Sequence, residues 1–199
     1  MSGSLVTDHP ELGPLLTDRP QRAKLLDAMV RVVAEKGYEA ATVADAVKLA
    51  RVSRGTFYDL FESKEACLAD AYRLGQAVLA ARVSDAVLGA KNWREEIRLG
   101  LRAYLRTFDD EPLFARVYLL EWAPVRAERE EGIRRFARRY GKSFTRAGVL
   151  VPEEALYTLA SGVHETTCAH VRAGRKANEL EDVLVGCALR LAGKEEPWT

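Results

Sequence analysis

Apolar residues recur at helical spacing along almost the whole chain, and this feature constrains the fold more than any other. Leu25, Met29, Val32 and Val33 fall on one face of a helix with about 3.6 residues per turn. Similar stripes continue into the C-terminal segment, and no useful length of sequence alternates apolar and polar residues as a half-buried strand does. The sequence therefore predicts an all-α fold of about nine helices.

Glycine, proline and capping residues divide the chain into these helices. Gly37 ends a first helix over 21–36, and Thr42, Ser53 and Ser63 have the side chains of N-cap residues for the next three. Thr42 also has Asp45 three positions later, the spacing of a capping box. Further helices are predicted over 92–109, 112–122, 125–147, 153–173 and after a cap at Asn178 paired with Glu181.

The helix pattern also predicts the domain organisation. Residues 1–19 show no sustained apolar period and contain Pro10, Gly13 and Pro14, so we expect a mobile N-terminal arm. Residues 20–66 are predicted to form a compact helical domain, and residues 67–199 a larger helical domain. A chain of 199 residues is long enough for two such domains.

Composition excludes several classes of protein. The chain is 48% hydrophobic and 30% charged, near the averages for globular domains. No uncharged apolar run approaches the roughly 20 residues of a membrane helix, and the N-terminus lacks the basic and apolar regions of a secretory signal. We expect a cytoplasmic protein with no membrane partner. Its 3 cysteines include no Cys-Xaa-Xaa-Cys pair, which favours reduced thiols.

Two short helices after the first long one have the arrangement of a helix-turn-helix over residues 42–58. In the second, Arg54 suits guanine edges or phosphate, Thr56 suits a thymine methyl group or phosphate, and Tyr58 is long enough to reach backbone oxygens. Gly55 permits close approach of the backbone. The helix N-termini at Thr42 and Ser63, with Lys64, are phosphate-binding candidates.

The charge of this region is basic although the whole chain carries a formal net charge of only +1. Nine Lys or Arg and six Asp or Glu lie between Arg19 and Lys64, which gives this segment a net charge of +3. A contact with nucleic acid must therefore come from a local patch.

Residues 22–68 resemble the N-terminal DNA-binding domain of the tetracycline-repressor (TetR) family. The resemblance is carried by Gly37-Tyr38, Thr42-Val43, Val52-Ser53, Thr56-Phe57-Tyr58, Phe61 and Lys64. It implies a one-component regulator, usually a repressor, that binds a double-stranded DNA operator as a homodimer and is released by a small-molecule inducer. The DNA-facing positions that it implies here are Thr42, Ser53, Arg54, Gly55, Thr56, Tyr58 and Lys64, with Phe57 and Phe61 at packing positions.

Three positions depart from the family pattern. Arg51 replaces a common glycine between the two short helices, where a positive φ costs a non-glycine residue about 1 kcal/mol. We count Arg51 as a further candidate for phosphate contact. Ala46-Val47 replaces a common Ile-Ala pair and shifts the packing under the second helix. Asp59 places a negative charge near the expected phosphate path, so Asp59→Asn is expected to strengthen non-specific DNA binding.

Aromatic residues spaced four apart recur in the second domain, as in Phe114 and Tyr118. Such stripes are more often plain core than the lining of a ligand pocket. With that alternative open, the predicted inducer-binding residues are Tyr104, Phe108, Tyr118, Glu121, Trp122, His164 and Cys168. A basic cluster allows either a solvated helix face, which we favour, or contact with an anionic ligand such as the phosphates of an acyl thioester. It comprises Arg134, Arg135, Arg138, Arg139, Lys142 and Arg146.

His164 and Cys168 also have the i, i+4 spacing of two zinc ligands on one helical face. The nearest third candidate, His170, lies about 240° around the helix from His164 and cannot join them. The chain also lacks a zinc-protease motif, a Gly-Xaa-Ser-Xaa-Gly elbow and a glycine-rich phosphate loop. We therefore predict no metal, no cofactor and no enzymatic activity. Alternatives to a regulator are a helical small-molecule carrier that has lost DNA binding and, less favoured, a metal-dependent hydrolase.

The last two predicted helices offer a dimer interface. Their apolar seams have near-heptad spacing, and Gly162 and Gly186 are small enough for close approach of helices. The predicted interface residues are Leu156, Leu159, Val163, Leu180, Val183, Leu184, Cys187 and Leu191. A two-fold reader needs recognition helices about 34 to 36 Å apart, and a four-helix interface would hold that spacing.

Overall fold

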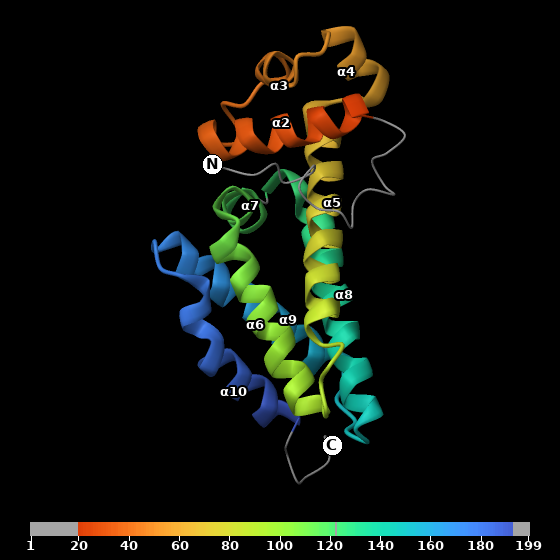
Figure 1. The fold of residues 1–199 in the computed structure, drawn as a ribbon, viewed down its shortest axis with the longest axis vertical. Helices are drawn as coiled ribbons and strands as arrows, with labels where there is room; N and C mark the ends of the chain where they lie inside the picture. Colours follow the sequence, from red (N-terminus) through yellow and green to blue (C-terminus); the bar gives the residue numbers. More distant parts are fainter. Residues whose placement is uncertain (1–19, 122, 193–199) are drawn as a thin grey trace. The chain divides into compact units, whose positions relative to one another are not determined.

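The computed structural model describes residues 20–121 and 123–192, and over these ranges the chain is helical without strands, as predicted (Figure 1). The described α-helices are α2 Pro20–Lys36, α3 Val43–Ala50, α4 Arg54–Leu60, α5 Lys64–Ala86, α6 Trp93–Asp110, α7 Pro112–Ala115, α8 Arg126–Arg146, α9 Glu153–Arg172 and α10 Glu181–Ala192. The predicted arm over 1–19 and the predicted ligand residue Trp122 lie outside the described residues. Within them, no helix is both long and apolar enough to cross a membrane.

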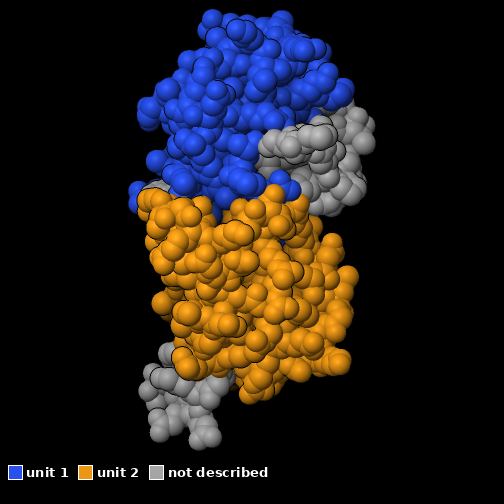
Figure 2. All heavy atoms as spheres, turned by 60° about the vertical axis from the view of Figure 1, so that its left-hand side comes forward, with its two compact units in different colours: residues 1–79, 111–128 blue, residues 80–110, 129–199 orange. Residues whose placement is uncertain are grey.

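The chain divides into two compact units, which Figure 2 shows in different colours. Unit 1 comprises residues 1–79 and 111–128, and unit 2 comprises residues 80–110 and 129–199. Each unit therefore contains two stretches of the chain. The domain boundary predicted after residue 66 lies within α5, and this helix contributes residues to both units.

In unit 1, the apolar stripe of α2 forms the centre of the core. Leu25, Met29 and Val33 are fully buried, and α3 packs along this helix. The fully buried ring of Phe57 anchors α4, and α7 with the following π-helix, η2 Arg116–Leu120, packs against α2. The second stretch of unit 1 thus lies against the first helix of the same unit.

In unit 2, α6 packs against α10 and against the 3₁₀ helix η4 Ala177–Leu180. The i, i+4 pair Leu101 and Leu105 in α6 is fully buried, and so is Phe144 in α8. Arg102 of α6 forms an ion pair with Glu181, at 2.7 Å, at the start of α10. The apolar stripes read from the sequence therefore face this core.

Two predictions about helix ends were wrong. The helix predicted over 112–122 is only the short α7, followed by the π-helix η2; after residue 122 comes a 3₁₀ turn, η3 Ala123–Val125. Asn178 does not cap the last helix, because it lies inside η4 and α10 begins at Glu181. The carboxylate of Asp109 accepts the backbone N–H groups of Ala177 at 2.7 Å and Asn178 at 3.0 Å. A side chain distant in sequence thus accepts the first two amides of η4.

Candidate nucleic-acid interface and interior polar site

The N-terminus of α3 is fixed by a complete capping box. Thr42 Oγ1 accepts a hydrogen bond from the N–H of Asp45 at 3.1 Å, and Asp45 Oδ2 accepts one from the N–H of Thr42 at 3.2 Å. Lys36 Nζ contacts the other carboxylate oxygen at 2.7 Å. Hydrogen bonds from Lys36 and Thr42 hold the pKa of Asp45 below its ordinary value. The predicted cap is confirmed, and Asp45 stays ionised at the end of the helix that favours a negative charge.

The turn after α3 contains Arg51, at the position where the family commonly has glycine. Arg51 has φ 55° and ψ 45°, and it is the one non-glycine residue with positive φ among those that the structure describes. Its N–H donates to the carbonyl of Lys48 at 3.4 Å, and the N–H of Val52 donates to that of Val47 at 3.1 Å. Arginine is therefore held in the left-handed conformation that glycine adopts at lower cost, and its side chain is exposed.

Polar side chains are exposed at the start of α4. Ser53 caps this helix, because its Oγ accepts the N–H of Thr56 at 2.9 Å. Arg54 lies over the ring of Tyr58, with the guanidinium carbon 5.6 Å from the ring centroid and Nη2 3.4 Å from Oη. Tyr58 is 49% exposed, whereas Phe57 beneath it is fully buried. The tip of α4 therefore presents an arginine and a phenol already in contact with each other.

Lys64 does not lie at an open surface. Its side chain is half-buried, and Nζ donates to the backbone carbonyls of Tyr38 at 2.9 Å and Ala41 at 3.0 Å. The ammonium also lies 4.0 Å from the centroid of the Tyr38 ring. Phosphate contact by Lys64 stays a prediction, and in this structure its charge is engaged by the loop between α2 and α3.

A chain of polar groups runs through the interior of unit 2. His164 Nδ1 lies 3.0 Å from Tyr104 Oη, and Arg129 Nε donates to His164 Nε2 at 3.2 Å. Because a guanidinium only donates, Nε2 must be the acceptor and Nδ1 carries the hydrogen that is donated to Tyr104. Burial, reinforced by the positive charge of Arg129, lowers the pKa of His164 to about 3, so the imidazole is neutral at pH 7. Arg129 also forms an ion pair with Glu165.

The structure brings together four of the predicted ligand residues. Tyr104 meets Phe108 edge-on at 5.0 Å between ring centroids, and Cys168 is buried one helical turn after His164. Burial raises the pKa of the Cys168 thiol to about 11. Sequence reasoning missed Arg129, although it continues the apolar stripe of α8 four residues before Ile133. A charged residue at a buried position of that stripe was the available signal.

The remaining ligand predictions lie in a different unit. Tyr118 belongs to unit 1, where its ring stacks on Tyr72 with centroids 4.6 Å apart. Glu121 is also in unit 1, and its Oε2 accepts the backbone N–H of Tyr38 at 3.1 Å. The polar chain around His164 belongs to unit 2, and contact of Tyr118 and Glu121 with a ligand stays a prediction.

Most of the basic residues of α8 have partners nearby. Arg138 pairs with Glu131 at 2.6 Å, and Arg139 donates to Ser84 Oγ at 2.9 Å. Arg146 pairs with Glu96 at 2.9 Å. Such pairs are typical of a solvated helix face. Over the described residues, no group of three or more His, Cys, Asp or Glu side chains is arranged to hold a metal ion.

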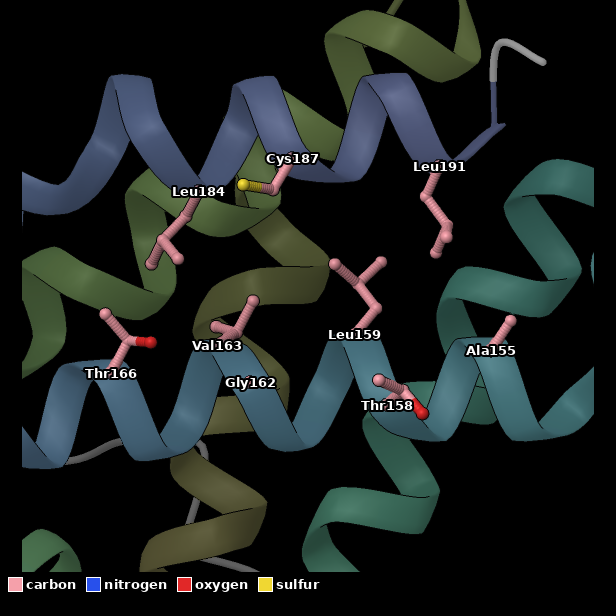
Figure 3. Close-up of a pocket in the computed structure, with 9 residues that line it drawn as sticks. All are labelled: Ala155, Thr158, Leu159, Gly162, Val163, Thr166, Leu184, Cys187 and Leu191. Atoms are coloured by element: carbon pink, nitrogen blue, oxygen red, sulfur yellow. The ribbon is translucent and has the colours of Figure 1, made fainter.

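An open apolar hollow of about 450 Å³ lies between α9 and α10 (Figure 3). Five of the predicted interface residues line it, namely Leu159, Val163, Leu184, Cys187 and Leu191. Val183 on α10 is 61% exposed, whereas Leu156 and Leu180 are buried. Val163 and Leu184 are also buried although they line the hollow, so the predicted seam contains both exposed and buried positions.

Comparison with known proteins adds to this geometry. Residues 25–71 match the family described as bacterial regulatory proteins, tetR family. A fatty acid metabolism regulator protein of Bacillus subtilis is 25% identical over 122 residues, which cover 61% of this chain and 63% of that protein. The HTH-type transcriptional regulator YvdT of the same organism is 44% identical over 45 residues, 23% of each chain. The chain thus spans less than two thirds of these curated relatives.

Solved structures show the same fold over most of the chain. A TetR-family protein from Syntrophomonas wolfei gives a TM-score of 0.75 at 19% identity and covers 92% of this chain and 100% of that one. FadR from Bacillus subtilis, solved in complex with stearoyl-CoA, gives a TM-score of 0.73 at 19% identity, with 86% of this chain and 98% of that chain covered. At these identities the likeness is one of fold.

Proposed function

Since this chain belongs to the tetR family of bacterial regulators and carries its DNA-binding helix-turn-helix, we propose that it represses transcription as a homodimer on a palindromic operator and is released by a small molecule. The observation that carries the proposal is the exposed tip of α4. Arg54 and Tyr58 are in contact there above a fully buried Phe57, on a helix whose start is fixed by Ser53. A short helix with this tip suits the major groove, where arginine reads guanine.

The proposal is tested by selecting bound sequences from randomised duplex DNA with the purified protein and its variants. We expect a palindrome with half-sites about one helical turn apart, or a multiple of that spacing. Arg54→Ala and Tyr58→Ala should bind the enriched duplex at least tenfold more weakly. Arg175→Ala removes the same charge from an exposed position in unit 2 and should bind normally. No enrichment with ligand-free wild-type protein would instead favour the carrier function.

The face formed by α9 and α10 supports the homodimer, with a second copy of this chain as its occupant. The hollow is lined mainly by apolar side chains, and the exposed Val183 extends the apolar surface of α10. Dimer interfaces have this apolar character. Sedimentation should give twice the chain mass for the wild type and a shift toward the monomer for Val183→Glu. Leu150→Glu, at a site that is 82% exposed, is the matched control and should stay dimeric. A monomeric wild type would contradict the dimer.

For the inducer, we propose an amphipathic molecule of the acyl-thioester class that meets the polar chain Tyr104–His164–Arg129. The buried guanidinium of Arg129 suits a negative or carbonyl oxygen, and the ring of Phe108 against Tyr104 suits an acyl chain. The structural neighbour FadR, solved with stearoyl-CoA, supports the same class.

Stearoyl-CoA is the probe for this ligand class, and coenzyme A is its control. We expect stearoyl-CoA to bind and to release the enriched duplex, and coenzyme A alone to do neither at the same concentration. Arg129→Gln should weaken stearoyl-CoA binding about tenfold or more, because it removes a charge-assisted hydrogen bond. Arg138→Gln, on the exposed side of α8, is the control. Absence of stearoyl-CoA binding, or equal affinity in Arg129→Gln, would contradict this assignment.

A further inference from the structure

The backbone N–H and C=O of Tyr38, in the loop between α2 and α3, are each held by a side chain, and the two side chains have opposite charges. Glu121 Oε2 accepts its N–H at 3.1 Å, and Lys64 Nζ donates to its carbonyl at 2.9 Å. The same ammonium donates to the carbonyl of Ala41 at 3.0 Å, which is the residue before the cap Thr42. In each bond a backbone group of Tyr38 meets an ionised side chain, so both bonds are charge-assisted.

The side chain of Tyr38 makes further contacts that hold this loop. Its phenol donates to the carboxylate of Glu65 in the first turn of α5, and its ring lies under the Lys64 ammonium. Burial, followed by the hydrogen bond with Glu65, raises the pKa of Tyr38 above its ordinary value. Gly37 precedes it with φ +79°, a conformation that glycine adopts at lower cost. The loop that leads into α3 is therefore fixed by side chains from outside α2 and α3.

Glu121 reaches this loop from a segment that is itself anchored. Tyr118 stacks between Phe114, at 4.9 Å, and Tyr72 of α5, at 4.6 Å between centroids. A Cβ at Gly75 of α5 would clash with the Phe114 ring, so the absence of a side chain there lets the ring lie against the helix. The π-helix η2 follows α7 and ends at Leu120, and the N–H of the next residue, Glu121, donates to the carbonyl of Val117 at 3.3 Å.

We infer that Glu121 is a positioning residue for DNA reading, because its carboxylate, together with Lys64, holds the backbone of Tyr38 and so fixes where α3 begins. The inference rests on the proposed function, since the position of α3 matters in this way only if α3 and α4 read DNA. Glu121 needs no contact with DNA for this role. It acts through the loop from Gly37 to Ala41, and through Thr42 on the start of α3.

Amide hydrogen exchange at Tyr38 directly tests the hydrogen bond from its N–H to Glu121. Glu121→Ala removes the acceptor, and the Tyr38 amide should then exchange at least tenfold faster than in the wild type. Glu121→Gln keeps an acceptor oxygen without the charge and should give an intermediate rate. Glu35→Ala removes a carboxylate with the same charge from an exposed position of unit 1 and should leave the rate unchanged. An unchanged rate in Glu121→Ala, in protein with wild-type helix content, would overturn the inference.

Affinity for the selected duplex tests the consequence. Glu121→Ala should bind it about tenfold more weakly, with Glu121→Gln between this variant and the wild type. The loss of a negative charge alone favours DNA binding, so Glu35→Ala should bind equally or slightly more tightly. Fast exchange at Tyr38 with unchanged affinity would overturn the positioning role. A wild-type protein that enriches no sequence would contradict the proposed function instead. The exchange data would still decide whether Glu121 holds the N–H of Tyr38.

Discussion

In the helix-turn-helix of unit 1, the hydrogen bonds that shape each helix start join residues three positions apart, whereas in the interior of unit 2 they join residues 35 and 60 positions apart. Thr42 with Asp45 and Ser53 with Thr56 belong to the first kind. His164 with Arg129 and with Tyr104 belongs to the second. Local bonds form wherever the helix forms, whereas the distant ones require the whole of unit 2 to be folded.

The two regions also differ in their exposure to water. The side chains of Arg54 and Tyr58 are solvent-exposed, so replacing them should change DNA binding with little effect on folding. His164 and Arg129 are at most 9% exposed, so their replacement affects the free energy of unfolding as well as any ligand. Function and stability should therefore be separable in the first region and coupled in the second.

The largest expected effect is in the core of unit 2. Phe144 is fully buried, and Phe144→Ala should lower the free energy of unfolding by about 3–5 kcal/mol through lost burial and the cavity that remains. Leu150→Ala, at an 82% exposed position of the same unit, should change it by less than about 0.5 kcal/mol. Urea unfolding measures both variants, and equal losses would contradict the described core.

The second effect is the pH dependence caused by His164. Its pKa is about 3 in the folded protein, against about 6.5 in an unfolded chain, so below pH 6.5 the unfolded chain takes up a proton that the folded protein does not. His164 therefore contributes fully to the free energy of unfolding above pH 6.5. This contribution is lost as pH falls toward 3, by about 1.4 kcal/mol per pH unit. His164→Gln should have a correspondingly shallower slope in urea unfolding between pH 6.5 and 5. The same slope in both proteins would show that His164 is solvated.

A smaller effect is expected at the cap of α3. Thr42→Ala should lower the free energy of unfolding by about 1 kcal/mol, because the N–H of Asp45 loses its acceptor. Thr42→Ser, which keeps the hydroxyl, should recover most of this loss. Thr145→Ala, at an exposed position of α8, should have little effect. Thermal unfolding measures all three, and a loss at Thr145 equal to that at Thr42 would remove the distinction between a cap and a surface hydroxyl.

The smallest effect is a gain at Arg51. Arg51→Gly should raise the free energy of unfolding by about 0.5 kcal/mol, since relief of the left-handed strain exceeds the added entropy of glycine in the unfolded chain. Arg51→Ala keeps that strain and should give no gain. If Arg51 contacts phosphate, both variants should also bind DNA more weakly and with a reduced salt dependence. A less stable Arg51→Gly would contradict the account of this turn.

The same contrast explains what could be predicted from the sequence. The caps at Thr42 and Ser53 were predictable because each depends on a residue three positions away. The contact of Lys64 with the carbonyls of Tyr38 and Ala41 was not, because it spans more than 20 residues. Asn178 was wrongly assigned as a cap for the same reason, since Asp109 lies 69 positions before it.

The polar interior of unit 2 was only partly predictable. Tyr104 was predicted from the aromatic residues spaced four apart and His164 as a further ligand residue, and the structure joins them through one hydrogen bond. Arg129 was overlooked because arginines are frequent in 125–147 and most of them lie on the exposed face. Its place on the apolar stripe of α8 was the local signal of its burial, whereas its contact with His164 joins residues 35 positions apart and no local pattern indicates it.

The central claim, that the exposed tip of α4 reads a specific sequence, is tested most directly by one ratio of affinities. Binding should be measured for the enriched duplex and for a duplex of the same length and composition with scrambled half-sites, at one salt concentration. The account predicts at least 10³-fold tighter binding to the enriched duplex, a ratio that Arg54→Ala should reduce at least tenfold. Affinities for the two duplexes that agree within threefold would contradict it, because attraction to phosphate alone would then explain the binding.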